Sequence, residues 1–495
     1  MELTSKTIEQ LLTAHHLLVA QPDSDQTFDF LHYDTRQVKD RTLFVVKGAF
    51  RVDYLAQATG VTGLVTEELL PVDLPQWQVT DVQKALSVLS MAFFDYPQND
   101  LWIGAFTGTK GKTTAAYMAF QILQHMTNQQ TALFSTVDRI TGNQPADKKK
   151  SDLTTPESYE LFKDMRRAVD NGMTHLVMEV SSQAYLKRRV YGLAFQVGAF
   201  LNISPDHIGP NEHPSFEDYL AHKMMLLDHA EQVVVNAESD QLATVLAHAK
   251  MHHDHVYTYS QTGQGGTYTY QSLESAIHES RFTVADSDLA AMSGTYRLNL
   301  PGDFNESNAL AALIMTALAG ASHEDMVAGL DTVFIPGRML SLPIPGHGVA
   351  FVDYAHNYAS MRALLQFAQS QYPDGEVSVV IGAPGNKGVS RRADFGQVVS
   401  EFADTVYLTA DDPQFESPMA IAKEIAAHIT NPEVTVHFEM DRIQAIQQAI
   451  AQAKPHDIVI VAGKGEDPYQ KINGVDEPYI GDYAVVQNVL NANHA

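Results

Sequence analysis

Short apolar runs alternate with stretches of helical periodicity along most of this chain. The first clear run is 101–106 (Leu-Trp-Ile-Gly-Ala-Phe), and similar runs follow at 176–180 and 198–203. Runs of this length predict buried strands, and the amphipathic stretches between them predict helices that cover the resulting sheet. The pattern therefore indicates an α/β protein built on mostly parallel sheets.

The same alternation returns in the last third of the chain, where strands are predicted at 349–354, 377–382, 406–410 and 458–462. Residues 254–300 differ, because alternating Thr and Tyr there predict a small antiparallel sheet. Turn-rich breaks near 96–99 and 335–338 divide the chain into three predicted domains, 1–98, 99–335 and 336–495. A length of 495 residues also exceeds what one hydrophobic core usually holds.

Composition narrows the classes of partner. The chain has 33 Lys and Arg against 59 Asp and Glu, a formal net charge of −26. Such an acidic surface disfavours nucleic acid and anionic membranes as partners, but leaves small anionic ligands possible in a local basic pocket. There is no cysteine, which excludes disulfides. Because we find no signal peptide and no apolar run near ~18 residues, we expect a cytoplasmic protein.

The segment after the first apolar run has phosphate-binding chemistry. It reads Gly108-Thr109-Lys110-Gly111-Lys112-Thr113-Thr114 and lies between a predicted strand and a predicted helix at 115–120. Glycines let backbone N–H groups close around phosphate oxygens; Lys112 would reach the β- and γ-phosphates, and Thr113 would offer its hydroxyl to Mg²⁺. Phe106 stands where the usual pattern has its first glycine, so the prediction depends on the strand-loop-helix context.

Further polar residues follow the next predicted strands. Glu179 ends one apolar run, and Asp206-His207 follows the next. Strand ends of a parallel sheet meet at one edge, so these groups would help to hold Mg²⁺, although Asp206 could equally cap a helix and His207 could be a surface residue. Lys223 falls in an amphipathic helix at 217–227, and composition alone predicts an exposed lysine there. Lys148-Lys149-Lys150 predicts a solvated loop.

Together these segments resemble the Mur ligases, the ATP-dependent amide-forming enzymes of peptidoglycan precursor synthesis. The resemblance runs nearly the whole length, with Lys110 replacing the family's usual Asn. It is carried by the phosphate loop, by Glu179-Val180-Ser181-Ser182 through Arg189, by Asp206-His207, by Asn305 and Asn308, by Pro336-Gly337-Arg338, and by Asp353-Tyr354-Ala355-His356.

The resemblance implies a central P-loop ATPase domain between an N-terminal α/β uridine-nucleotide domain and a C-terminal Rossmann-like domain that binds an amino acid. It implies a monomer with four further ATP contacts, namely Asn308, Arg338, Asp353 and His356. It also implies that Lys112, Glu179, His207 and Lys223 are catalytic. Mg²⁺ would be held by Thr113, Glu179, His207 and a carbamylated Lys223, since a carbamate is the oxygen ligand that Mg²⁺ accepts.

Within the family, the branch that adds the third peptide residue is the most similar. Asp34-Thr35-Arg36, with Thr35 where Ser is usual, resembles its uridine-nucleotide segment, and Thr154-Thr155-Pro156 resembles its contact to the muramoyl dipeptide. The segment 462–470 resembles that branch's C-terminal segment. The resemblance implies that UDP-MurNAc-L-Ala-D-Glu is bound by Thr35, Thr154, Thr155, Ser182 and Arg189.

The incoming amino acid is indicated by Asp411-Asp412-Pro413-Gln414. Relatives that use meso-diaminopimelate have Asp-Asn-Pro-Arg here, and their arginine binds the distal carboxylate of that substrate. Gln414 and the additional carboxylate of Asp412 favour an ammonium instead, so we expect L-lysine. L-Ornithine is the nearest alternative, because one methylene discriminates weakly. Arg392 is expected at the α-carboxylate, and Gly463, Glu466 and Asp467 are expected near the ammonium.

The predicted reaction is ATP-dependent amide formation through an acyl phosphate. The D-glutamate γ-carboxylate would attack the γ-phosphate of ATP, and the amine of lysine would then attack the acyl carbon. A folate polyglutamylating ligase shares the central and C-terminal layout, but it would not need the uridine-nucleotide segment at 34–48.

Overall fold

A computed structural model describes residues 2–206, 208–209, 212–275, 279–300, 303–336, 340–371, 373–386 and 388–492. His207 and Arg338, both predicted site residues, lie outside these ranges. The chain forms two compact units, each described by itself below. The first comprises Met1–Leu273, Arg281–Arg297 and Phe304–Val333, and the second comprises Glu274–Ser280, Leu298–Asp303 and Phe334–Ala495.

The first unit begins with a five-stranded sheet in the order β2-β7-β6-β5-β4. Its strands β4 to β7 pair in parallel, whereas β2 pairs antiparallel with β7. The elements of this part are β1 (Leu3–Thr4), α1 (Ser5–Ala14), β2 (Leu18–Ala20), β3 (Thr27–Phe28), β4 (Phe30–His32), β5 (Thr42–Val45), β6 (Val61–Thr66), β7 (Gln76–Val79) and α2 (Val82–Phe93). Asp81 caps α2 by accepting from the backbone N–H groups of Gln83 and Lys84.

An eleven-stranded sheet forms the rest of the first unit, in the order β11-β10-β9-β12-β8-β13-β14-β15-β16-β17-β18. The strands β9, β12, β8, β13 and β14 pair in parallel, with Glu179 opposite Phe106. The strands are β8 (Trp102–Thr107), β9 (Thr131–Phe134), β10 (Asp138–Ile140), β11 (Lys148–Lys150), β12 (His175–Glu179), β13 (Phe195–Phe200), β14 (Ala230–Asn236), β15 (Tyr257–Gln261), β16 (Tyr268–Ser275), β17 (Ser280–Val284) and β18 (Gly294–Leu298).

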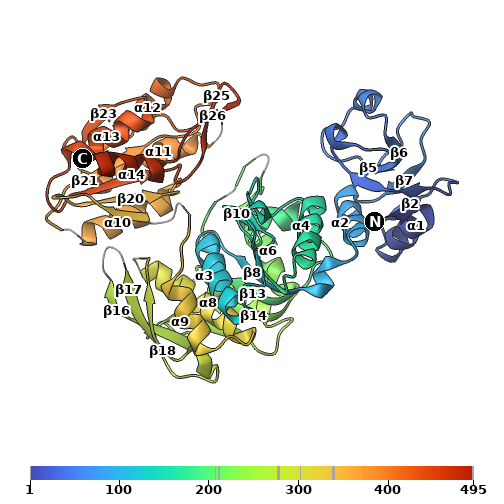
Figure 1. The fold of residues 1–495 in the computed structure, drawn as a ribbon, viewed down its shortest axis with the longest axis horizontal. Coiled ribbons are helices and arrows are strands. Elements are labelled where there is room, and N and C mark those ends of the chain that lie inside the picture. The colour runs from blue at the N-terminus through green and yellow to red at the C-terminus, as the bar shows by residue number, and fades with distance from the viewer. Residues whose placement is uncertain are drawn as a thin grey trace. The chain divides into compact units, whose positions relative to one another are not determined.

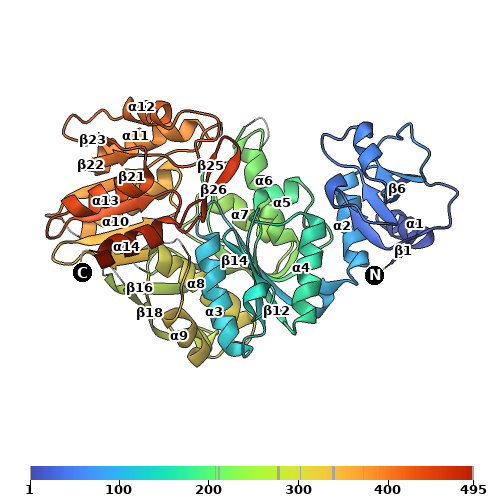
Figure 2. The same ribbon diagram turned by 45° about the horizontal axis from the view of Figure 1, so that its top comes forward.

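Helices cover this sheet, with α3 on one side and α4 on the other (Figures 1 and 2). One continuous cluster of buried apolar side chains runs from Leu3 in β1 and Trp77 in β7 to Phe134 in β9 and Leu226 in α6. The helices are α3 (Lys112–Met126), α4 (Ser158–Asp170), α5 (Ser182–Leu186), α6 (Phe216–Asp228), α7 (Leu242–Ala249), α8 (Asp303–Leu318) and α9 (His323–Asp331).

Two local predictions need correction. Strands do form within 254–300 as expected, but they are not a small sheet of their own, because β15 pairs in parallel with both β14 and β16 and joins them to the central sheet. Lys148–Lys150 is not a loop but the exposed edge strand β11, paired antiparallel with β10. Its lysines form ion pairs with Asp138 and Asp164, and charged side chains of this kind protect a sheet edge. The α/β fold class is confirmed.

The second unit contains a six-stranded sheet in the order β19-β20-β24-β21-β22-β23, parallel except for β19. Its strands are β19 (Leu340–Pro343), β20 (Val349–Asp353), β21 (Val377–Ile381), β22 (Thr405–Leu408), β23 (Thr435–Phe438) and β24 (Ile458–Ala462), followed by the hairpin β25 (Tyr469–Ile472) and β26 (Val475–Pro478). The helices are α10 (Tyr358–Gln371), α11 (Ser390–Phe402), α12 (Pro418–Ala426), α13 (Arg442–Gln452) and α14 (Asp482–Ala492).

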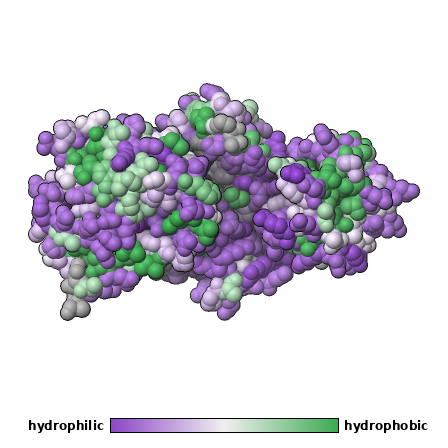
Figure 3. Space-filling view, turned by 90° about the horizontal axis from the view of Figure 1, so that it is seen from above, coloured by the Kyte–Doolittle hydropathy of each residue, from purple (hydrophilic) through white to green (hydrophobic). Residues whose placement is uncertain are grey.

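The face seen in Figure 3 is mostly hydrophilic, with small scattered apolar patches. Among the described residues, no helix has the length and apolarity that crossing a bilayer requires. The three-domain division of the chain stays a prediction.

A buried ion pair joins two helices of the second unit. Arg442, at the start of α13, donates from Nε and Nη2 to the two carboxylate oxygens of Asp482, at 2.7 and 2.8 Å, and both side chains are almost fully buried. The Tyr479 hydroxyl also donates to Asp482, at 2.7 Å.

We expect Arg442→Met to destabilise the second unit by about 3–5 kcal/mol, because it leaves the Asp482 carboxylate buried without its cation. Lys454→Met is the matched control, since Lys454 pairs with Glu376 in an exposed position and should change stability by less than about 1 kcal/mol. Urea unfolding of both variants measures the difference. Equal effects would contradict the importance of the buried pair.

Candidate functional site

The phosphate loop connects the end of β8 to the start of α3. Gly108 and Gly111 both have positive φ, +157° and +79°, and Gly111 is the N-cap of α3. The Lys112 ammonium donates to the carbonyl oxygens of Gly108 and Thr109, at 2.8 and 3.4 Å. The ammonium is thus held over the loop, where the helix N-terminus and the loop N–H groups favour an anion.

Asn202 and Asn308 fix the loop from two sides. The Asn202 side chain accepts from the N–H of Lys110 at 2.9 Å and donates to the Lys110 carbonyl at 3.1 Å. A Cβ atom at Gly111 would lie 2.3 Å from Oδ1 of Asn308, so α8 approaches the loop as closely as a glycine allows. The predicted nucleotide residue Asn308 therefore contacts the loop itself.

Glu179 forms the centre of the site in the first unit, and it has no exposed surface. Its Oε1 accepts from the Thr113 hydroxyl at 2.9 Å and from the N–H of Thr136 at 2.7 Å, and its Oε2 accepts from the Thr136 hydroxyl at 3.0 Å. The structure thus places two predicted metal-site residues, Thr113 and Glu179, against each other. These oxygen donors fit a hard cation such as Mg²⁺.

Lys223 is buried, not exposed as composition alone predicted. Its ammonium donates to the Gly108 carbonyl at 2.7 Å and lies 4.7 Å from the Tyr219 ring centre. Burial, aided by the nearby charge of Lys112, holds the pKa of Lys223 well below its usual range. A neutral amine beside the phosphate loop is the form that reacts with CO₂.

The predicted dipeptide-binding segment lies directly beside Glu179. The Thr155 hydroxyl donates to the Glu179 carbonyl at 3.0 Å and accepts from the N–H of Ser181 at 3.1 Å. The Thr154 hydroxyl lies 3.1 Å from the Thr136 hydroxyl and can donate to it, because the Thr136 proton is directed at Glu179. Ser182 begins α5 one residue further on and is almost fully buried.

Arg189 donates from Nε to the Glu157 carboxylate at 2.8 Å, and Lys47 donates to the same carboxylate. Burial alone would raise the pKa of Glu157, but Arg189 and Lys47 together lower it. Thr35 begins the short 3-10 helix Thr35–Gln37 that follows β4, where it lines a hollow of about 570 Å³ with Arg36 and Tyr54 among others.

In the second unit, the predicted amino-acid-binding segment follows β22. Asp412 is already paired, because its Oδ1 accepts from the Lys464 ammonium at 2.8 Å and from the N–H of Lys471 at 3.0 Å. The Asp411 carboxyl is buried, which raises its pKa. A Cβ at Gly463 would lie 2.9 Å from Oδ2 of Asp411, so the glycine makes room for this group.

This pairing changes the charge argument for substrate choice. The additional carboxylate of Asp412 does not stand alone, since an internal lysine accompanies it. The Lys464 ammonium also lies 3.6 Å from Asp467. Any preference for an ammonium must therefore come from the carboxylates around Lys464 together and from the missing arginine at Gln414.

The neighbouring segments hold the other predicted residues. Gln414 has φ +55° and its N–H donates to the Lys471 carbonyl at 2.9 Å, so Pro413 and Gln414 are fixed against the hairpin. The N–H of Glu466 donates to the Tyr354 hydroxyl at 3.1 Å. The Asp353 carbonyl accepts from the N–H of Gly463 at 3.0 Å, and His356 interacts through Nδ1 with the Tyr354 carbonyl at 2.7 Å.

Arg392 has partners other than the predicted substrate carboxylate. It is 3% exposed and donates to Glu424 at 2.6 Å, to Glu416 at 3.0 Å and to the Pro384 carbonyl at 3.4 Å. A substrate carboxylate would have to displace one of these acidic groups. The role of Arg392 in amino-acid binding stays a prediction.

Sequence reasoning missed Thr136, Asn202 and Tyr219, which hold Glu179 and the phosphate loop. Thr136 and Asn202 each follow the last residue of a central strand by two positions, β9 and β13 respectively. Their position at the carboxyl edge of the sheet was the available signal, since ligands of parallel sheets gather there. Tyr219 gave no such signal because it lies within α6, where its hydroxyl meets the Thr109 hydroxyl at 3.1 Å.

Comparison with known proteins agrees with this geometry. Residues 106–316 match the Mur ligase middle domain, and residues 337–465 match the Mur ligase glutamate ligase domain. A UDP-N-acetylmuramyl-tripeptide synthetase of Latilactobacillus sakei is 49% identical over 99% of both chains. A UDP-N-acetylmuramoyl-L-alanyl-D-glutamate–L-lysine ligase of Enterococcus faecalis is 45% identical over 96% of this chain and 94% of its own.

Solved structures give the same result for the fold. A UDP-N-acetylmuramoyl-L-alanyl-D-glutamate–2,6-diaminopimelate ligase superposes with a TM-score of 0.68 at 25% identity, and the match covers both chains completely.

A non-glycine residue in the left-handed backbone conformation costs roughly 1–2 kcal/mol. Gly111→Ala should destabilise the first unit by more than this, because the new methyl group also meets Asn308. Gly172→Ala is the matched control, since Gly172 has φ +82° and open space around it. Thermal unfolding of both variants measures the difference. If Gly111→Ala cost no more than the control, the close contact with Asn308 would be refuted.

Proposed function

Because the chain belongs to the Mur ligase family, we propose that it uses ATP to join L-lysine to the D-glutamate γ-carboxylate of UDP-MurNAc-L-Ala-D-Glu. The observation that carries the proposal is the convergence of the phosphate loop, Glu179 and the Thr155–Ser182 segment at one sheet edge. A relative named as the L-lysine ligase, similar along nearly the whole chain, supports the choice of amino acid.

The phosphate loop performs the first step. Backbone N–H groups of residues 108–114 cradle the phosphates of ATP, and the Lys112 ammonium stabilises negative charge on the transferring phosphoryl group. The γ-carboxylate of D-glutamate attacks the γ-phosphorus, which gives an acyl phosphate and ADP. The neutral α-amine of lysine then attacks the acyl carbon, a proton leaves the nitrogen, and phosphate departs.

The residues around Glu179 fit a bound Mg²⁺. Thr113 and Glu179 would hold it, together with His207 and a carbamylated Lys223. Mg²⁺ would supply charge neutralisation at the phosphates. Unmodified Lys223 does not fit as a ligand, because an ammonium has no lone pair and repels a cation. Its lowered pKa makes the neutral amine available for carbamate formation.

The remaining predicted contacts divide by substrate. Thr154, Thr155, Ser182 and Arg189 hold the dipeptide end, and Thr35 lies in the part of the chain proposed for the uridine nucleotide. Asn308, Asp353 and His356 are proposed ATP contacts. The Asp411–Gln414 segment, with Glu466 and Asp467, is proposed to select lysine, since an arginine that could bind a distal carboxylate is absent at Gln414.

Phosphate release from ATP with UDP-MurNAc-L-Ala-D-Glu, measured with three amino acids in parallel, tests this function. We expect turnover with L-lysine, weak turnover with L-ornithine and at least about 100-fold less with meso-diaminopimelate, whose distal carboxylate would lie unpaired. Product masses identify the amide, and Lys112→Ala should abolish turnover without unfolding the chain. Equal activity with diaminopimelate would keep the ligase class but refute the lysine assignment.

Carbamylation of Lys223 should appear as a carbamate carbon-13 resonance in protein equilibrated with labelled bicarbonate. The resonance should be absent from Lys223→Arg, whose guanidinium does not form the carbamate under these conditions. Ligation should fall when dissolved CO₂ is removed and recover when bicarbonate returns. Full activity with Lys223 shown to be unmodified would overturn this part of the proposal.

A further inference from the structure

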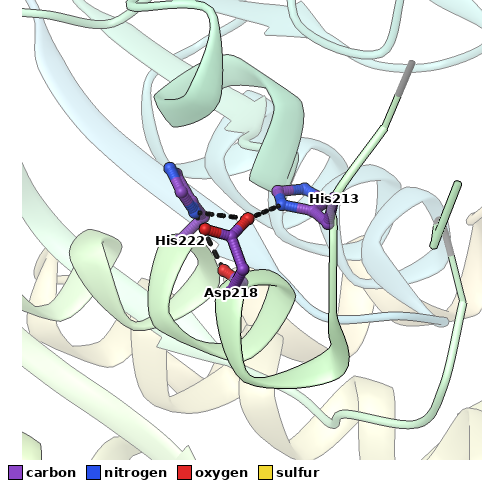
Figure 4. A group of neighbouring side chains, drawn as sticks. All are labelled: His213, Asp218 and His222. Carbon is purple, nitrogen blue, oxygen red and sulfur yellow. Dashed lines mark hydrogen bonds and ion pairs between the residues drawn. The ribbon is translucent and has the colours of Figure 1, made fainter. Parts of the chain in front are cut away.

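A chain of hydrogen bonds connects Ser182 to a buried histidine and an aspartate. His213 exposes no surface, and its Nε2 lies 2.9 Å from the Ser182 hydroxyl while its Nδ1 lies 2.7 Å from Oδ2 of Asp218. The His222 ring lies on the other side of the same carboxylate, so that Asp218 is placed between two imidazoles (Figure 4). Ser182 is a proposed dipeptide contact, whereas His213, Asp218 and His222 have no role in the mechanism above.

The Asp218 side chain is held in place at the start of α6. It is the third residue of α6, and its backbone N–H is capped by the Ser215 hydroxyl. A carboxylate in the first turn is stabilised by the helix dipole. His222 Nδ1 lies 2.8 Å from the backbone carbonyl oxygen of Asp218. Because a carbonyl oxygen only accepts hydrogen bonds, this nitrogen bears a proton, and the same N–H also faces the side-chain carboxylate of Asp218.

The hydrogen bonds then assign the tautomer of His213. The Asp218 carboxylate is an acceptor, so His213 Nδ1 carries the proton and donates to it. In the neutral imidazole, Nε2 is left as an acceptor, and the Ser182 hydroxyl must donate to it. The hydroxyl proton of Ser182 is thereby used in the hydrogen bond to His213 Nε2. Toward a substrate, the Ser182 oxygen can then act only as a hydrogen-bond acceptor.

We propose that His213 and Asp218 are positioning residues that hold Ser182 as a hydrogen-bond acceptor, so that it binds an amide N–H of the muramoyl dipeptide. This inference rests on the proposed function, because it takes the dipeptide as the group that reaches Ser182. A serine held in this way favours a substrate N–H or O–H. It disfavours a substrate carboxylate, because the serine oxygen has no proton left to donate to the negatively charged oxygens. Ser182 thus distinguishes the peptide backbone from the acidic side chain that must stay free to react.

Two other interpretations of the group make different predictions. Three ligand atoms within 4.8 Å of one another could hold a metal ion. However, the 2.7 and 2.9 Å contacts of His213 have hydrogen-bond lengths, and a metal at Nδ1 would replace the proton that orients the ring. A buried histidine whose ring nitrogens are satisfied could also serve packing alone, and packing would not depend on Ser182.

A double-mutant cycle separates these cases. We expect Asp218→Asn to raise the KM for UDP-MurNAc-L-Ala-D-Glu about three- to tenfold, the value of one neutral hydrogen bond, with the KM for ATP unchanged. Ser182→Ala should have a similar effect. In the Ser182→Ala background, Asp218→Asn should add less than about twofold, because the pair acts through the hydroxyl. Effects that multiply in the double variant would overturn the proposal and favour a structural role.

Asp228→Asn is the matched control. Asp228 lies at the other end of α6 and accepts from His248 Nε2 at 2.7 Å, so it forms a second aspartate–histidine pair away from Ser182. We expect no change in any KM. Thermal unfolding of each variant shows whether a loss of binding reflects a loss of folded protein.

Nitrogen-15 spectra of the histidine rings test the hydrogen-bond relay Ser182–His213–Asp218 without any substrate. The His213 signals, assigned by their loss in His213→Gln, should show a protonated Nδ1 and an unprotonated Nε2 in the wild type. A protonated Nε2, or ring signals that shift on adding Zn²⁺ alone, would overturn the relay. If the spectra agree but the wild type does not bind UDP-MurNAc-L-Ala-D-Glu, the proposed function fails and the assignment of Ser182 to the dipeptide fails with it, whereas the tautomer stands.

Discussion

The site in the first unit depends on a carboxylate that has no access to water. Glu179 ends the strand next to β8, and an ionised carboxylate buried there is tolerated only because three hydrogen bonds from Thr113 and Thr136 satisfy it. These bonds tie the first turn of α3 to the end of β9, while Thr155 secures the Glu179 carbonyl and the turn into α5. The side chain and backbone of Glu179 thus hold the phosphate loop, the proposed metal ligand Thr113 and the proposed dipeptide segment in fixed positions.

The parts of the fold that sequence could predict are those set by local physics. The strand before the phosphate loop, the glycines with positive φ and the helix that begins at Lys112 follow from apolar runs and loop chemistry alone. The strand ends that carry Glu179 and Asp353 were predictable for the same reason, since parallel strands bring their carboxyl ends to one edge.

The parts that could not be predicted depend on tertiary contacts between segments that are far apart in the sequence. Alternating Thr and Tyr at 254–300 predicted strands, but nothing local states that β15 pairs in parallel with the central sheet. Composition predicted an exposed Lys223, and only tertiary packing buries it beside Gly108. Likewise, Asp412 and Arg392 were the expected residue types in the expected segments, but Lys464 in one case and Glu416 with Glu424 in the other already neutralise them.

One ion-pair arrangement bears on how far the chain can be dissected. Glu157, the N-cap of α4, forms ion pairs with Lys47, from the segment after β5, and with Arg189, from the segment after α5, and the apolar core continues from the N-terminal sheet into the central one. A protein that lacks residues 1–98 would keep Glu157, but it would lose Lys47, one of the two cations that pair with Glu157. It would also lose the apolar side chains that the first 98 residues contribute to the shared core. The N-terminal 98 residues therefore do not behave as an independent part of the chain. A chimera that takes this region from another ligase needs a cationic side chain at the position of Lys47.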